Sequence, residues 1–312
     1  MPKPIRIGTR ESQLAQWQAR QVKNLLAELG FSSELVLIKS GGDIDLQTPL
    51  YEMGVQGIFT KELDIALIHK QVDMAVHSFK DVPTQLAKGI EVAAVLERGP
   101  VEDLLVFKNE EAAGKYKSIS NNPSSFTVAT SSIRRKAQWL HRYPGHIIEN
   151  LRGNVNTRLR KLSEENWDAA IFARAGLERI DLRPANSIVL EWMLPAPAQG
   201  AMVIVCREDD KHCLDACRQL NHEETFLCTQ VERDFLRKLL GGCSTPISAL
   251  ALIDKDKVSF KGSLLSLDGK QKVEVEAVET INNASKLGTR AALELLDKGG
   301  RTILENTKNA KS

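Results

Sequence analysis

The sequence contains no long hydrophobic run, which excludes several classes of protein. No segment of the 312 residues is long enough to cross a membrane, and residues 1–8 enter a strand-like alternation without an apolar signal region. The formal net charge is only +2, and the basic residues are spread along the chain and not gathered into a tail. We therefore expect a cytoplasmic protein that has neither a membrane nor a nucleic acid as its partner.

Cysteine is also scarce, and the five residues present form no paired framework that would suggest disulfides. They are Cys206, Cys213, Cys217, Cys228 and Cys243. Cys213 and Cys217 lie one helical turn apart, with His212 and His222 nearby, and they are the one hint of a metal site. Structural zinc sites bring tighter paired spacings, so we interpret the pair as one face of a helix and expect no metal.

The glycine-rich signatures of nucleotide binding are missing as well: there is neither a phosphate loop ending in Gly-Lys-Ser/Thr nor a dinucleotide fingerprint. Four short polar clusters instead stand at the ends of predicted strands or the starts of predicted helices, where open α/β sheets bind ligands. They are residues 8–12, 76–83, 129–135 and 151–160. Taken singly, each cluster also fits helix capping and surface charge. Together, their arginines would converge on one cleft and favour a polycarboxylate ligand.

Strand and helix patterns alternate through the first two thirds of the chain, which is typical of parallel sheets covered by helices. The expected strands are residues 5–8, 34–39, 73–77, 91–96, 126–130, 146–151, 168–173 and 201–206, and the expected helices are 12–29, 59–69, 132–142 and 154–162. After residue 221 the pattern changes to a helix at 225–240, strands at 248–253, 257–265 and 272–279, and a helix at 284–296. This order predicts a small antiparallel α+β domain.

A chain of 312 residues is too long for one ordinary core, so we expect three domains. Domain 1 would comprise residues 1–98 and 200–218, domain 2 residues 103–195, and domain 3 residues 222–312. The first two would be doubly wound α/β domains. The buried strand at 201–206 would return the chain to domain 1 after a proline-containing linker. Residues 40–57 lack periodicity, which is typical of a functional lid or a disordered loop.

Two residues invite a chemical interpretation. Cys243 lies on a turn after Gly241 and Gly242, which leave space beside its sulfur. The residues alone leave two readings open, an accessible thiol or a small buried hydrophobe. Asp81 is the one acid in the otherwise basic cluster at 76–83. It would either stabilise a cationic intermediate and move protons, or cap a helix or pair with a cation.

The motifs resemble those of the porphobilinogen deaminase family in order and spacing, from about Ile5 to beyond Ala292. The matching segments are His-Ser-Phe-Lys-Asp-Val-Pro at 77–83, Thr-Ser-Ser-Ile-Arg-Arg at 130–135, Arg-Gly-Asn-Val-Asn-Thr-Arg at 152–158, residues 195–201, and Gly-Gly-Cys at 241–243. The resemblance implies two domains like those of periplasmic binding proteins and a third that carries the cysteine. It also implies a monomeric transferase of tetrapyrrole, and hence haem, biosynthesis.

The same resemblance implies the chemistry. Cys243 would hold a dipyrromethane cofactor through a thioether, four porphobilinogen units would be added head to tail with loss of ammonia, and hydrolysis would release hydroxymethylbilane. Asp81 would be the catalytic residue that stabilises a cationic azafulvene. The cofactor-binding residues would be Ser78, Lys80, Ser132, Arg134 and Arg135, besides Cys243. The substrate-binding residues would be Arg10, Ser12, Lys61, Arg152, Arg158, Arg179 and Gln199.

Four residues depart from the family pattern: Gln56 for a usual lysine, Phe79 for methionine, Ala198 for glycine and Val205 for glutamate. The last two lie near the expected hinge between domains. The rival hypothesis is a two-lobed polycarboxylate-binding protein that has lost catalysis. Asp81 together with an accessible Cys243 argues against it.

Overall fold

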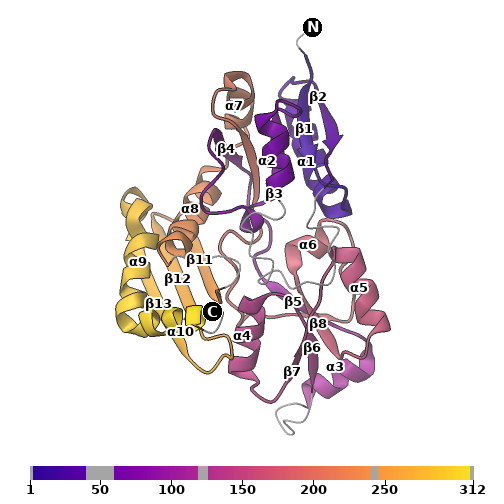
Figure 1. Cartoon of the computed structure of the whole chain (residues 1–312), viewed down its shortest axis with the longest axis vertical. Coiled ribbons are helices and arrows are strands. Elements are labelled where there is room, and N and C mark those ends of the chain that lie inside the picture. The colour runs from indigo at the N-terminus through magenta and orange to yellow at the C-terminus, as the bar shows by residue number, and fades with distance from the viewer. Residues whose placement is uncertain (1–2, 40–59, 119–125, 240–244, 310–312) are drawn as a thin grey trace. The chain divides into compact units, whose positions relative to one another are not determined.

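The computed structural model describes residues 3–39, 60–118, 126–239 and 245–309, which belong to two compact units (Figure 1). Unit 1 comprises residues 1–46, 55–100 and 199–227, and unit 2 comprises residues 47–54, 101–198 and 228–312. Among the described residues, no helix combines the length and the apolar character needed to span a bilayer. The division into three domains with the boundaries given above stays a prediction.

The sheet of unit 1 has five strands in the order β2-β1-β3-β10-β4. They are β1 (Ile5–Thr9), β2 (Ser33–Leu37), β3 (Met74–Ser78), β4 (Ile90–Val95) and β10 (Met202–Arg207). β1 runs parallel to β2 and β3, whereas β10 runs antiparallel to both β3 and β4. The pairing of β10 with β3 and β4 shows that the apolar run after the linker joins the first sheet, and all six of its residues are buried.

Helices cover both faces of this sheet. α1 (Gln13–Glu28) and α7 (Lys211–Arg218) share one apolar core with the strands, and α2 (Lys61–Ile68) packs on the other face, where the Leu63 side chain meets Gly8 of β1. The sequence predicted α1 and α2 to within two residues at each end. It also placed Cys213 and Cys217 on one face of a helix, and both are buried on α7.

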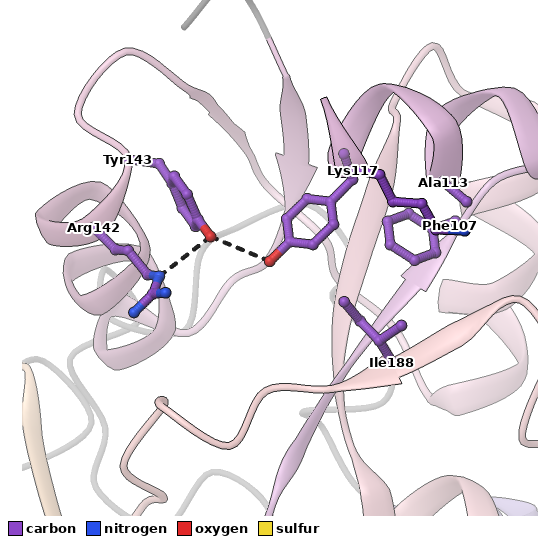
Figure 2. A pocket seen from close by; sticks show the side chains of 7 residues that line it. Phe107, Ala113, Lys117, Arg142, Tyr143 and Ile188 are labelled. Carbon is purple, nitrogen blue, oxygen red and sulfur yellow. Dashed lines mark hydrogen bonds between the residues drawn. The ribbon is translucent and has the colours of Figure 1, made fainter. Parts of the chain in front are cut away.

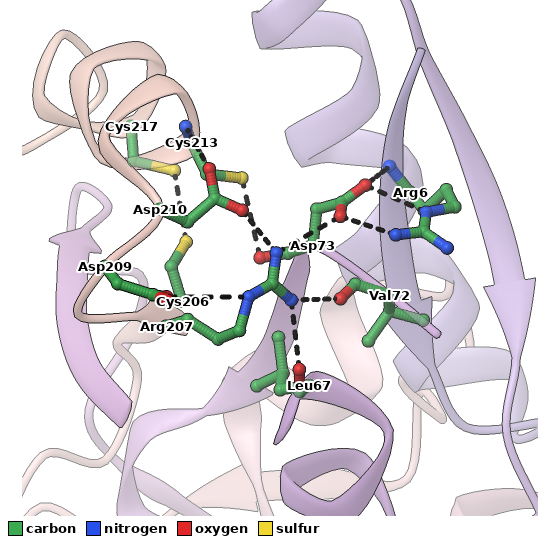
Figure 3. A network of polar contacts seen from close by, with 10 residues as sticks. All are labelled: Arg6, Leu67, Val72, Asp73, Cys206, Arg207, Asp209, Asp210, Cys213 and Cys217. Carbon is green, nitrogen blue, oxygen red and sulfur yellow. Dashed lines mark hydrogen bonds and ion pairs between the residues drawn. The ribbon is translucent and has the colours of Figure 1, made fainter. Parts of the chain in front are cut away.

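A polar network ties the start of α7 to the sheet, at the end of β10 (Figure 3). Arg207, at the end of β10, donates to the carbonyl oxygens of Leu67 (3.0 Å) and Val72 (2.6 Å) and pairs with Asp73 and Asp210. Asp73 also forms an ion pair with Arg6 of β1 at 2.7 Å. The Arg207 guanidinium therefore joins the end of β10 to α2, to the segment before β3 and to the cap of α7.

Three thiols pack beside this network, with the Cys206 and Cys217 sulfur atoms 3.9 Å apart. Hydrogen bonds with the neighbouring thiols, of Cys213 first and then of Cys217, raise the pKa of Cys206, and burial raises it further. Cys206 is thus a neutral thiol at physiological pH.

The first sheet of unit 2 also has five strands, in the order β7-β6-β8-β5-β9. They are β5 (Asp103–Phe107), β6 (Thr127–Ala129), β7 (Ile147–Glu149), β8 (Ala169–Ala173) and β9 (Ser187–Val189). α3 (Glu110–Lys117) and α4 (Ile133–Arg142) share one apolar core with the sheet, while α5 (Val155–Glu164) and α6 (Arg174–Glu178) share the core on its other face. The sequence analysis set no bounds for β5 and missed α3, α6 and the three-residue strand β9.

Unit 2 contains a second sheet, which is antiparallel and has three strands in the order β11-β12-β13. They are β11 (Ile247–Asp254), β12 (Lys257–Leu265) and β13 (Lys272–Thr280). The helices of this part are α8 (Glu223–Lys238), whose first five residues belong to unit 1, η4 (Ile281–Lys286), α9 (Leu287–Leu295), η5 (Leu296–Gly300) and α10 (Arg301–Asn309). The last helix was not predicted. The two α/β sheets and this small antiparallel sheet confirm the expected fold class.

α8 lies against both the antiparallel sheet and α9. The Phe235 ring of α8 meets Phe260 of β12 edge-on, with ring centroids 5.1 Å apart. Gly288 brings the backbone of α9 so close to α8 that a Cβ atom there would lie 1.9 Å from the Val231 carbonyl oxygen. The contact between the two helices therefore requires glycine.

We predict that Gly288→Ala lowers the free energy of unfolding by about 1–3 kcal/mol, because the added methyl group forces the two helices apart. Gly114→Ala on α3 is the matched control, since a Cβ there meets nothing within 4 Å. It should leave stability unchanged or raise it by about 0.5–1 kcal/mol. Urea denaturation measures both variants, and equal stability of Gly288→Ala and wild type would contradict the close approach.

Candidate functional site

In unit 1, the predicted residues gather where β1 and β3 end. The parallel register pairs Gly8 with Ala75, so continuing it brings Arg10 beside His77. Burial, and secondarily the charge of Arg10, lower the pKa of His77 to about 3. His77 is therefore a neutral core side chain at neutral pH.

The segment after β3 forms a 3-10 turn, η2 (Phe79–Asp81), in which Phe79 is buried. Ser78 accepts a hydrogen bond from Gln18 Nε2 at 2.9 Å, and Lys80 Nζ donates to Gln199 Oε1 at 3.3 Å. Asp81 ends the turn and is partly exposed. The structure thus brings Lys80 and Gln199 together although they lie 119 residues apart in sequence.

Two further residues of this set occupy the starts of helices. Ser12 caps α1, with its side chain accepting from the Ala15 N–H at 3.4 Å. Lys61 begins α2 and is exposed. Within the described part of the chain, no hydrogen bond or ion pair joins Lys61 to the other members of the set. Its grouping with them stays a prediction.

In unit 2, the two adjacent arginines of α4 share one buried carboxylate. Arg134 Nη2 donates to Asp103 Oδ2 at 2.6 Å, and Arg135 Nη2 donates to Asp103 Oδ1 at 2.7 Å. Their other terminal nitrogens donate to the carbonyl oxygens of Leu194 (2.7 Å) and Ile171 (2.9 Å). Asp103 is fully buried and both arginines are 5% exposed.

Among the described residues, this cluster sets two positive charges against one negative charge. Two guanidiniums face one carboxylate, and the Nε atoms of Arg134 and Arg135 are buried without a hydrogen-bond partner among the described residues. Burial lowers the pKa of Arg134, as expected for a cation out of water. The sequence analysis missed Asp103. An aspartate at the head of the apolar run Asp-Leu-Leu-Val-Phe was the available signal.

The remaining predicted residues of unit 2 lie at the ends of β6, β7 and β8. Ser132 caps α4 by accepting from the Arg135 N–H, and Arg152 follows β7 with 2% exposure. Arg158, in the first turn of α5, donates from Nε to the Gly153 carbonyl at 2.7 Å. Burial lowers the pKa of Arg179, after α6, to about 10, which leaves it charged at neutral pH.

The helices that follow these strand ends share an electrostatic feature. α1, α4 and α5 have no acidic residue in the first turn, as is also true of α6, α7, α9 and α10, whereas α2, α3 and α8 each carry two. The positive end of a helix dipole is ordinarily compensated by acids. At α1, α4 and α5 the positive end of the helix dipole lies instead beside hydroxyl groups and arginines. These residues fit an anionic cofactor or substrate that carries several carboxylates.

A second buried carboxylate that the sequence analysis missed lies on α8. Glu232 is fully buried and accepts from the Ala198 N–H at 2.6 Å and from the Ala251 N–H at 2.8 Å. Ala198 has a φ of +61°, in the left-handed region that favours glycine. At this position, where the family pattern has glycine, the backbone N–H of Ala198 is hydrogen-bonded to Glu232. The available signal was an acid on the apolar side of the predicted helix, between Val231 and Phe235.

Some predicted features lie outside the described residues. These are Cys243, with the two glycines before it, and Gln56 in the aperiodic segment. Among the residues that are described, no group of three or more His, Cys, Asp and Glu side chains is arranged to hold a metal ion.

Comparison with known proteins gives two family matches. Residues 5–215 match the model described as porphobilinogen deaminase, dipyromethane cofactor binding domain, and residues 226–297 match porphobilinogen deaminase, C-terminal domain. The porphobilinogen deaminase of Pelotomaculum thermopropionicum is 40% identical over 312 residues, which cover 99% of this chain and 98% of that protein. That of Listeria monocytogenes serotype 4a is 39% identical and covers 99% of this chain and 100% of its own.

Among solved structures, the methionine binding protein MetQ is 16% identical, with a TM-score of 0.44, over 70% of this chain and 90% of its own. The substrate binding protein of an amino acid ABC transporter is 13% identical, with a TM-score of 0.37, over 70% and 91% of the two chains. Scores this low carry no argument about function.

We predict that Asp103→Asn costs about 3–5 kcal/mol of stability, because it leaves two buried guanidiniums without a counter-ion. The matched control is Glu164→Gln on α5, which removes an exposed ion pair with Arg160 and should cost no more than about 0.5 kcal/mol. Thermal and urea unfolding measure the difference. Equal losses in the two variants would show that the shared carboxylate does not hold α4 in place.

Proposed function

The chain belongs to the porphobilinogen deaminase family, and on that premise we propose that it condenses four porphobilinogen molecules head to tail. Each addition releases ammonia, and hydrolysis then releases hydroxymethylbilane. This makes the chain a transferase of tetrapyrrole and haem biosynthesis. The observation that carries the proposal is the pair of family matches, which together span residues 5–215 and 226–297. A polycarboxylate-binding protein without catalysis has no support from these matches.

The cofactor is dipyrromethane, in keeping with the description of the family model that matches residues 5–215. When bound, it supplies the free pyrrole carbon onto which the first substrate unit is joined. We assign its covalent attachment to Cys243 through a thioether. Ser78 and Lys80 in unit 1 and Ser132 at the start of α4 would donate hydrogen bonds to its carboxylates.

Arg134 and Arg135 contribute to cofactor binding in a different way from open guanidinium forks. Their terminal nitrogens are already bonded to Asp103 and to backbone carbonyls. What they offer is the net positive charge of these described residues, in a buried setting where a fixed charge acts strongly. Asp103 thus holds the two arginines in place and leaves them a net charge for an anion.

Substrate binding follows from the acetate and propionate groups that each pyrrole ring carries. As rings are added, the number of carboxylates grows, and several separated cations are needed to bind them. We assign this role to Arg10, Ser12, Lys61, Arg152, Arg158, Arg179 and Gln199. In support, Arg152 and Arg179 are largely buried, so their charges are weakly screened by water.

Asp81 is assigned the catalytic role. Loss of ammonia breaks the aminomethyl carbon–nitrogen bond of the substrate and leaves a cationic azafulvene. A carboxylate beside this cation stabilises it, accepts a proton from the pyrrole nitrogen and returns it in a later step. The position of Asp81 at the end of η2, partly exposed, supports this assignment.

Cellular context completes the proposal. We place the enzyme in the cytoplasm as a monomer that acts on a small molecule, without a nucleic-acid or membrane partner. The near-neutral net charge of +2 supports the absence of a nucleic-acid partner.

We predict that the intact mass of the purified protein exceeds that of the bare chain by two linked pyrrole units. Cys243→Ser should remove this excess, because the thioether cannot form. Cys228→Ser is the matched control, since Cys228 is a buried thiol on α8 and should not affect the added mass. An unmodified wild-type chain, or an unchanged excess in Cys243→Ser, would refute the attachment.

We predict that Asp81→Asn lowers kcat by about 100-fold or more, whereas KM changes by less than about threefold, because the carboxylate acts mainly on the charge that develops in the transition state. Asp256→Asn, at the turn before β12, serves as a control with the same change of charge and should turn over like wild type. Steady-state assays of ammonia or hydroxymethylbilane release measure both. Wild-type turnover of Asp81→Asn would exclude the assigned role.

A further inference from the structure

A pocket of about 410 Å³ opens in unit 2 beside the end of α4 (Figure 2). It is lined by side chains from α3, β5, β9 and the end of α4, among them Phe107, Tyr116, Lys117, Arg142, Tyr143 and Ile188. A volume of this size is typical of sites for small organic ligands. Nothing in the proposed reaction uses it.

The pocket is separate from the polar cluster at the start of α4. Ser132 caps the amino end of α4, and Arg142 is its last residue. A helix of ten residues is about 15 Å long, so the two sites lie at opposite ends of the same helix. A ligand in this pocket would therefore not occupy the place assigned to the anionic substrate in this unit.

Aromatic rings form one wall of the pocket. The ring centroids of Phe107 and Tyr116 lie 5.5 Å apart, and those of Tyr116 and Tyr143 lie 6.3 Å apart. Ile188 is 37% exposed and lines the pocket as well. Figure 2 shows Phe107 and Ile188 facing the same space. Such a surface favours a flat apolar ring, which stacks against aromatic side chains.

The pocket contains two tyrosine hydroxyl groups, and the proton of one of them has no hydrogen-bond acceptor among the described residues. Arg142 Nε–H can only donate, and it donates to the Tyr143 oxygen at 3.2 Å. The Tyr116 and Tyr143 oxygens are 3.2 Å apart, so one hydroxyl donates to the other and the second keeps its own proton. In the part of the chain that the structure describes, no acceptor is found for that proton. Burial raises the pKa of Tyr116, which keeps its phenol protonated.

Two cations complete the lining, and the described residues provide no carboxylate partner for either. The Arg142 guanidinium lies over the Trp192 ring, 4.9 Å from its centroid, and 5.7 Å from that of Tyr143. This stacking fixes its plane and leaves its terminal N–H groups available. Lys117 stands at the end of α3. The lining contains no acidic side chain, so the pocket offers donors and positive charge to a ligand.

We propose that this pocket binds a flat aromatic carboxylate. Its ring lies against Phe107 and Tyr116, and its carboxylate accepts from the spare phenol proton and from Arg142, while Lys117 adds a second positive charge to the lining. A carboxylate supplies the acceptors that the pocket lacks, and an aromatic body matches the apolar wall. This site is independent of the proposed catalytic function, since it uses none of the residues assigned to cofactor or substrate.

The test is isothermal titration of the full-length protein with 1-naphthoate, and with 1-naphthylmethanol as a neutral probe of the same shape. We expect one molecule of naphthoate per chain, bound at least about tenfold more tightly than the alcohol, because the alcohol cannot satisfy the cations. Arg142→Gln should weaken naphthoate binding by about tenfold or more. Ala113→Leu, which fills the pocket without changing charge, should weaken it at least as much.

Two controls separate this pocket from the other cationic surfaces. Lys136→Gln removes an exposed cation elsewhere on α4, and Arg158→Gln removes one of the cations assigned to the substrate. Both should bind naphthoate like wild type. The inference is overturned if wild type does not bind naphthoate at millimolar concentration, if the alcohol binds equally well, or if Arg158→Gln abolishes binding while Arg142→Gln and Ala113→Leu retain it.

Discussion

The arrangement of unit 2 depends on one carboxylate, that of Asp103, which is shared by two arginines. A pair of guanidiniums at the start of a helix is unfavourable, because the helix dipole is already positive there. Asp103, reaching from β5, makes the arrangement possible and fixes α4 to the sheet. The cluster keeps a net charge of one sign inside a low-dielectric region. An anionic ligand would complete the balance, so that stability and ligand binding use the same groups.

Helix starts with positive charge and no compensating acid also occur at the other strand ends. α1 and α5 also begin without acids, and polar or cationic side chains stand where compensating carboxylates are usual. Acidic first turns occur on α2 and α3. Helices α7 and α9 also begin without acids in the first turn, so it is the neighbouring hydroxyls and arginines that set α1, α4 and α5 apart.

The sequence predicted what depends on local patterns and missed what depends on tertiary pairing. The long amphipathic helix α1 and the apolar strand β10 were located closely, because their periodicity is strong. α3 and β9 were missed, since the first is short and weakly amphipathic and the second has three residues. The strand-end motifs identified the arginines, but no local pattern shows that Arg134 and Arg135 are bonded to Asp103, 31 and 32 residues away.

Glu232 places a strict demand on the chemistry of its position. Its two oxygens accept from two backbone N–H groups, those of Ala198 and Ala251, which lie 34 and 19 residues away along the chain. Glutamine has nearly the same shape, yet its NH₂ group would present a donor to one of these donors. Glutamine in place of Glu232 would therefore lose one of the two hydrogen bonds although its shape is nearly the same. The match of two acceptor oxygens with two N–H donors, more than size or charge, connects α8 to the linker and to strand β11.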